Sequence, residues 1–156
     1  MRGGGLSYDR AMDVVLEAVT RVNVRALCEL RLGAGQQGLV APAAFTIAEG
    51  HHEPGALLRA IYADGGPVGV LLVETEGLAP FLVRFMITED RQRSGIGRHA
   101  VELISEELRE AGWTELEVSF VHVAGGAEGF WRHCGFTDTG RRNYEGEHIF
   151  TRRLDP

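Results

Sequence analysis

The stretch that decides the fold is "TEDRQRSGIGRHAVELI", residues 88–104, in which two glycines stand directly before an amphipathic pattern. Gly95, Gly97 and Ala100 match the spacing G-x-G-x-x-A. A phosphate group binds well where a helix begins, because free backbone N–H groups meet the positive end of the helix dipole there. The stretch is therefore half of a dinucleotide fingerprint, a cradle for the pyrophosphate of another coenzyme, or an ordinary helix entry.

The dinucleotide interpretation fails on its context. In dinucleotide-binding folds the glycine turn leaves its strand almost directly, whereas at least six residues separate the strand end near Ile87 from Gly95. Only one strand–helix–strand unit is present, and too little chain remains for a second half. A P-loop also fails, because it requires a lysine and all 16 basic residues of this chain are arginines.

The composition is typical of one globular domain. Of the 156 residues, 44% are hydrophobic and 24% are charged. We expect a flexible leader over 1–12 and a single domain over 13–156. The net charge of −6 argues against a general nucleic-acid binder. No apolar run approaches the roughly 20 residues of a membrane span, and no apolar signal segment is seen near the start, so a cytoplasmic protein is expected.

The cysteines and histidines give no sign of a disulfide or a metal site. Cys28 and Cys134 lie in apolar surroundings and are expected to be buried free thiols. His51 and His52 are adjacent, so they cannot form the i, i+4 pair of a helical zinc site, and the other four histidines are scattered. We therefore expect no metal.

The hydrophobic patterns predict an α/β domain on a mixed, mainly antiparallel sheet. "DGG" between two strand-like runs and "EGE" at 145–147 are hairpin signals. Strands are expected over 13–19, 57–63, 67–75, 80–88 and 115–123, with two more near the end of the chain. Helices are expected over 21–31 with Thr20 as the N-cap, after Pro42, over 98–112 and within 126–136.

Two motifs together resemble the GCN5-related N-acetyltransferase (GNAT) superfamily. "QRSGIG", residues 92–97, fits Q/R-x-x-G-x-G directly before an amphipathic helix. "FWRHCGF", residues 130–136, is similar to the superfamily segment F-Y-x-x-x-G-F, about 35 residues downstream. The resemblance implies a central sheet of six to seven strands with flanking helices. It also implies that the strands near 80–88 and 115–123 splay apart.

The same resemblance implies acetyl-CoA as the cosubstrate. The pantetheine would fill the gap between the splayed strands, and the glycine loop would hold the pyrophosphate. One backbone N–H of the first splayed strand would act as the oxyanion donor. The implied cofactor-binding residues are Phe85, Met86, Ile87, Gln92, Arg93, Ser94, Gly95, Ile96, Gly97, Arg98 and Trp131.

A closer likeness concerns the acceptor. The segments "QQGLVAPAAFTIAEGHHEPG", "RFMITEDRQRSGIG" and "EGEHIF" look like the bacterial spermine/spermidine (diamine) acetyltransferase-like branch. This likeness implies transfer of the acetyl group to a primary amine, with polyamines among the acceptors, and a homodimer as the expected assembly. Gln36 and Gln37 are candidates for lining the acceptor pocket.

The sequence names no clear catalytic residue. The attacking amine must lose a proton, and Glu74 and Glu117 are weak candidates for the base. Trp131 replaces the family tyrosine that protonates the leaving thiolate, and an indole cannot supply that proton. Tyr144 is a candidate for the displaced role. The alternative is a non-catalytic acyl-CoA-binding or regulatory module on the same fold.

Overall fold

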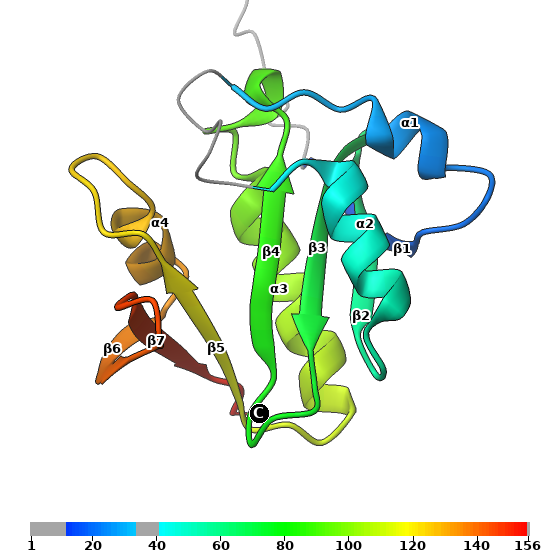
Figure 1. Cartoon of the computed structure of the whole chain (residues 1–156). Coiled ribbons are helices and arrows are strands. Elements are labelled where there is room, and N and C mark those ends of the chain that lie inside the picture. Colours follow the sequence, from blue (N-terminus) through cyan, green and yellow to red (C-terminus); the bar gives the residue numbers. More distant parts are fainter. Residues whose placement is uncertain (1–11, 34–40, 156) are drawn as a thin grey trace, which may run out of the picture.

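The computed structural model describes residues 12–33 and 41–155 (Figure 1). Seven strands form one sheet in the order β1-β2-β3-β4-β5-β7-β6. All neighbouring pairs are antiparallel except β4 and β5, which run parallel. The strands are β1 Val14–Ala18, β2 Leu57–Ala63, β3 Gly66–Glu74, β4 Phe81–Ile87, β5 Glu115–Phe120, β6 Thr137–Arg142 and β7 His148–Arg153. The predicted mixed sheet and element order are confirmed.

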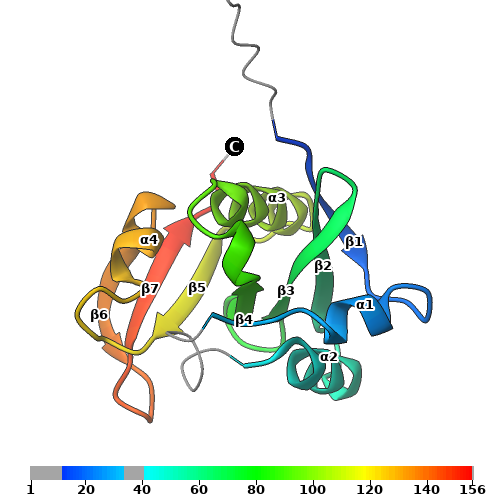
Figure 2. The same ribbon diagram turned by 90° about the horizontal axis from the view of Figure 1, so that it is seen from above.

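Helices cover the sheet on both faces (Figure 2). α1 (Val24–Cys28) and α2 (Ala43–His52) lie on one face, and α3 (Ile96–Glu110) and α4 (Glu128–His133) lie on the other. The larger core lies on the side of α3 and α4, and a smaller core lies under α2. Within the described part of the chain, no helix covers β5, β7 and β6 on the side of α1 and α2.

The amphipathic pattern of α3 explains its position. Val101, Ile104 and Leu108 recur at helical spacing and are fully buried against the sheet. Each contributes about 1.5–3 kcal/mol of hydrophobic stabilisation. The helix begins two residues earlier than predicted, because Gly95 rather than a later residue is its N-cap.

A β-bulge in β4 opens the sheet. Leu72 pairs with Arg84 and the next residue of β3, Val73, pairs with Leu82, so Val83 is an extra residue. β4 pairs with β5 only through Phe81 to Glu117 and Leu82 to Val118. Beyond these pairs the two strands separate (Figure 1). The splay that the family resemblance implied is therefore present.

The first predicted helix is wrong in its start and its cap. The helix begins at Val24 with Asn23, not Thr20, at its N-cap. The Asn23 side chain accepts a hydrogen bond from the Thr20 N–H at 2.8 Å and donates one to the Ala18 carbonyl at 3.0 Å. These local bonds stabilise a turn in place of the first predicted helical turn.

The two cysteines differ in their surroundings. Cys134 is a buried free thiol, as predicted, whereas the prediction for Cys28 is wrong because this free thiol is exposed. α1 has only one turn beyond its cap and directs Leu27 rather than Cys28 into the protein. Nearly all of the predicted leader over 1–12, and both Gln36 and Gln37, lie outside the described residues.

Candidate functional site

The loop between β4 and α3 ends in a helix N-terminus without a side-chain cap. Gly95 is the N-cap in a left-handed conformation, with φ 87° and ψ −2°, which a glycine adopts at low cost. As a glycine, the cap residue has no side chain that could bond to the N–H groups of the first helical turn. An uncapped helix start leaves such groups available to an anion.

Internal hydrogen bonds hold this loop against the end of β4. The Gln92 side-chain amide donates to the Ile87 carbonyl at 2.9 Å, and Ser94 Oγ donates to the Arg91 carbonyl at 2.6 Å. Arg93 has a positive φ of 59°, which is unusual for a residue other than glycine. The backbone therefore turns sharply at the position where the family resemblance implies a pyrophosphate.

Two arginines supply positive charge around the loop. Arg93 and Arg98 are both exposed. Arg98 Nη1 lies 3.1 Å from His133 Nε2 and so connects the first turn of α3 with α4. The two arginines predicted to contact a pyrophosphate thus lie on the solvent side of the loop, while Ile96 is fully buried and anchors the loop in the core.

Gly97 faces aromatic rings. A Cβ atom at this position would lie 3.2 Å from two ring carbons of Phe130 and 3.6 Å from one of Phe85. A larger residue would therefore push α3 away from these rings. The second glycine of the motif thus has a packing reason that the sequence pattern does not reveal.

The edge of β4 that borders the gap carries backbone groups that do not bond to β3. The Thr88 N–H donates to the Val68 carbonyl on the β3 side at 2.8 Å. Backbone groups alternate in direction along a strand, so those of Met86 also point to β3, while those of Phe85 and Ile87 point into the gap. Of the three residues expected to hold a pantetheine, Phe85 and Ile87 direct their backbone groups into the gap, where the Ile87 carbonyl already accepts from Gln92.

An aromatic cluster lies behind the gap. Trp131 is only 5% exposed, and its ring centroid lies 5.6 Å from Phe85, 4.8 Å from Phe130 and 5.3 Å from Phe136. Trp131 therefore occupies the position of the family tyrosine as a buried packing residue beside β4.

Glu74 lies far from the loop. It is the last residue of β3 and pairs with Phe81, the first residue of β4. The loop follows the other end of β4, about 20 Å away at the usual rise of a strand. Burial and the nearby Glu53 and Glu49 carboxylates raise the pKa of Glu74, and Arg84 opposes the shift.

Glu117 and Tyr144 lie nearer to the gap in the sheet order but differ in environment. Glu117 is opposite Phe81, where β4 and β5 still pair, and its carboxylate forms an ion pair with Arg141. Tyr144 lies in the turn between β6 and β7 and is 96% exposed. The three catalytic candidates from the sequence are therefore not brought together.

A different carboxylate, that of Glu147, is held in place by hydrogen bonds. Its Oε1 accepts hydrogen bonds from Ser119 Oγ at 3.2 Å and from Asn143 Nδ2 at 2.8 Å. Asn143 Oδ1 in turn accepts the N–H groups of Glu145 and Glu147, which shapes the predicted hairpin turn. The turn sequence "NYEGE" carries a signal for the Asn143–Glu147 bond, but no local pattern predicts the bond from Ser119.

An open cavity of about 410 Å³ lies beside this carboxylate. It is formed by the end of β5 and the turn between β6 and β7. His122 and His148 are among its lining residues, with ring centroids 5.6 Å apart. His148 Nδ1 lies 3.3 Å from Asp138, and His122 Nδ1 lies 3.7 Å from Glu128.

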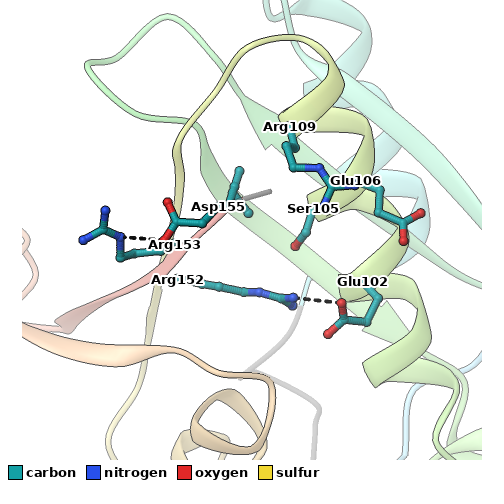
Figure 3. A pocket seen from close by; sticks show the side chains of 8 residues that line it. Glu102, Ser105, Glu106, Arg109, Arg152, Arg153 and Asp155 are labelled. Carbon is teal, nitrogen blue, oxygen red and sulfur yellow. Dashed lines mark hydrogen bonds and ion pairs between the residues drawn. The ribbon is translucent and has the colours of Figure 1, made fainter.

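A second, smaller cavity of about 70 Å³ lies at the opposite end of α3 (Figure 3). Arg152 donates to Glu102 at 2.8 Å, and this hydrogen bond lowers the pKa of Glu102. Ser105 Oγ and Arg152 Nη1 are buried there without a partner in the described residues. The place suits bound water, which commonly satisfies such groups.

Metal-binding and membrane-spanning features are absent from the described part of the chain. Within residues 12–33 and 41–155, no group of three or more histidine, cysteine, aspartate or glutamate side chains is arranged to hold a metal ion. No helix in this part of the chain has the length and apolar character needed to cross a membrane.

Solved structures with the same fold include several acetyltransferases. A domain from Methanocaldococcus jannaschii superposes with a TM-score of 0.74 at 15% identity, covering 91% of this chain and 99% of that one. The PaiA N-acetyltransferase from Thermoplasma acidophilum in complex with coenzyme A superposes with a TM-score of 0.67 at 13% identity, covering 90% of this chain and 99% of that one. The ribosomal-protein-S18-alanine N-acetyltransferase from Escherichia coli superposes with a TM-score of 0.69 at 18% identity, covering 92% of this chain and 96% of that one.

Sequence comparison identifies the family. No curated protein matches the sequence significantly. The family model described as Acetyltransferase (GNAT) domain matches residues 38–152, which include the glycine loop, both gap strands and α4. This match supports an acetyl-CoA-dependent N-acetyltransferase, and the chain belongs to the GNAT acetyltransferase family.

Proposed function

We propose that the protein transfers the acetyl group of acetyl-CoA to a primary amine by direct attack, with polyamines as the first acceptors to test. The observation that carries this proposal is the opening between β4 and β5, which leads directly into the uncapped start of α3. A gap at an unpaired strand edge suits an extended amide chain such as pantetheine, and a helix start suits its pyrophosphate.

The proposed contacts follow from this arrangement. The pyrophosphate meets the backbone of the loop from Gln92 to Gly97, with Arg93 and Arg98 at its rim. The pantetheine lies along the free edge of β4 as an additional strand. The Phe85 N–H, which points into the gap, polarises the thioester carbonyl.

The acceptor class rests on the sequence likeness to the spermine/spermidine branch. The net charge of −6 is compatible with a cationic acceptor. The structural relative from Escherichia coli acts on an alanine of ribosomal protein S18, so a protein N-terminus is the competing acceptor. A polyamine and a protein N-terminus are both primary amines, and an acceptor panel separates them.

Calorimetric titration with acetyl-CoA tests the cradle. Gly97→Glu is a poor probe, because the new side chain meets Phe130. Ser94→Glu places a negative charge on an exposed loop position without disturbing the core. We expect about tenfold weaker binding or more, since like charges about 4 Å apart repel by roughly 1 kcal/mol in water and roughly 4 kcal/mol near a protein surface, and about 1.4 kcal/mol corresponds to tenfold.

Two controls make this titration decisive. Ser94→Ala removes the Ser94 hydroxyl but adds no charge, and Thr137→Glu adds the same charge at the exposed start of β6. Both should bind acetyl-CoA within about threefold of the wild type. Equal binding by the Ser94→Glu and wild-type proteins would refute the cradle, whereas tight binding without any amine acetylation would favour the non-catalytic module.

Cellular location and assembly are part of the same proposal. Two free thiols fit a reducing compartment, and we propose a bacterial cytoplasmic enzyme. A homodimer is predicted from the family resemblance, and sedimentation equilibrium will test it.

A further inference from the structure

We infer that Glu147 is the carboxylate that binds the ammonium group of the acceptor and removes its proton. This inference rests on the proposed amine acetylation. It assigns a role to a residue that the sequence pattern did not single out, in the turn that precedes β7.

The sheet register places Glu147 beside the gap. β4 and β5 run parallel, with Leu82 opposite Val118 as their last pair. The next residue of β5, Ser119, therefore lies level with the bulge at Val83, where the gap begins. Ser119 Oγ donates to the Glu147 carboxylate, so this carboxylate lies at the mouth of the gap.

Strand alternation sets the face on which it lies. Leu116, Val118 and Phe120 point into the core beneath α3 and α4. Ser119 alternates with them and points to the other face of the sheet. The described helices leave this face of β5 and β7 uncovered (Figure 2), and it is the face that the inference assigns to the acceptor, with coenzyme A on the side of α3.

The hydrogen bonds of Glu147 leave one oxygen available. Oε1 accepts from Ser119 and Asn143, which fixes the orientation of the carboxylate. Within residues 12–33 and 41–155, Oε2 has no hydrogen bond or ion pair. Glu147 also lines the cavity of about 410 Å³. An ammonium group is the complement of a held carboxylate with a free oxygen beside open space.

The cations around Glu147 are engaged elsewhere. Arg142, His122 and His148 line the same cavity as Glu147, Arg141 precedes Arg142 in β6, and each of the four has another acceptor. Arg141 pairs with Glu117, Arg142 donates to the Gly146 carbonyl, His148 faces Asp138 and His122 faces Glu128. The nearby Glu145 carboxylate is exposed. Among the described residues no cation forms an ion pair with Glu147, although Arg142 bonds to a neutral carbonyl and keeps its charge in the same cavity.

The acceptor nitrogen loses two protons during the transfer. The ammonium group gives one proton to Glu147 Oε2 and becomes a neutral amine. The amine nitrogen then forms a bond to the acetyl carbon, and the carbon–sulfur bond breaks with its electron pair on sulfur. The second nitrogen proton passes through solvent to the thiolate. Glu147 releases its proton to water, so the products are the amide, free coenzyme A and one proton.

Glu147→Gln tests the inference with Glu145→Gln as a matched control from the same turn. Thiol release and spermidine binding to the coenzyme A complex are measured for each protein, together with acetyl-CoA affinity. A lost general base costs about 10²–10⁴-fold in rate. We expect kcat/KM for spermidine to fall at least about 100-fold and spermidine affinity at least tenfold in Glu147→Gln, with acetyl-CoA affinity unchanged.

The outcomes separate this inference from the proposed function. If the Glu147→Gln variant keeps the spermidine affinity and the kcat/KM of the wild type, the proposed role of Glu147 is overturned. An equal loss in Glu145→Gln would overturn it too, because the effect would belong to the turn as a whole. A wild-type protein that binds acetyl-CoA and spermidine but releases no thiol would refute the transfer itself, and the two spermidine affinities would still decide whether Glu147 binds the amine.

Discussion

Gly69 on β3 lies where a single methyl group would displace the strand that borders the gap. A Cβ atom on Gly69 would fall well inside contact distance of the Met86 carbonyl oxygen and 3.1 Å from Ile87 Cδ1. A backbone carbonyl cannot turn aside as a flexible side chain does. β4 would therefore have to move by about an ångström to restore normal contact.

The cost of Gly69→Ala follows from this clash. Overpacking in a buried site costs typically 1–3 kcal/mol, and the reduced freedom of the unfolded chain returns about 0.4–1 kcal/mol. Because the added Cβ meets a backbone atom, the upper end of this cost applies, and we expect a net loss of about 2 kcal/mol in the free energy of unfolding. For a chain of this size that corresponds to a fall in Tm of about 4–8 °C, measurable by calorimetry or circular dichroism.

Gly66→Ala is the matched control, because it lies on the same strand. Its nearest atom outside the neighbouring residues, the Ala63 carbonyl oxygen, is 4.0 Å from the added Cβ. Its Tm should stay within about 2 °C of the wild type. If Gly69→Ala melted as late as Gly66→Ala, the tight contact between β3 and β4 would be refuted.

The remaining predictions concern ionisable groups. The Arg152 hydrogen bond lowers the pKa of Glu102 in the folded protein. This bond therefore stabilises the fold above the ordinary pKa of 4.5, and the stabilisation is lost as the pH falls through the lowered pKa. Glu102→Gln should therefore melt below the wild type at pH 7 and approach it below pH 4, and a constant difference across this range would contradict the pairing. Burial raises the pKa of Cys134 to about 11. Iodoacetamide at pH 8 should therefore alkylate only the exposed Cys28, and mass spectrometry of the labelled protein will check this. Equal labelling of both would contradict the burial.

The sequence predicted features that depend on local patterns. The stripe of α3 and the "DGG" hairpin follow from residues close together in the chain, and both are present. Asp64 and Gly65 both have positive φ, as the predicted hairpin turn requires. The gap came from the family resemblance, since nothing in the residues around Val83 marks a bulge.

The candidate site was less predictable because it depends on distant pairs. The bond from Ser119 to Glu147 joins residues 28 positions apart, and it exists only because β5 pairs with β7. The search from sequence therefore favoured Glu74 and Glu117, which lie on strands with clear patterns. The late start of the predicted first helix has a local cause instead, because the Asn23 side chain bonds to backbone groups before it.

The bulge at Val83 reverses the direction of every later backbone group in β4. Before it, the Pro80 carbonyl accepts the Glu117 N–H at 2.9 Å, so even-numbered positions point to β5. After it, the even-numbered Thr88 points to β3 instead. In a regular strand the backbone groups of Phe85 and Ile87 would point to β3. One inserted residue therefore decides which backbone groups of β4 face the gap.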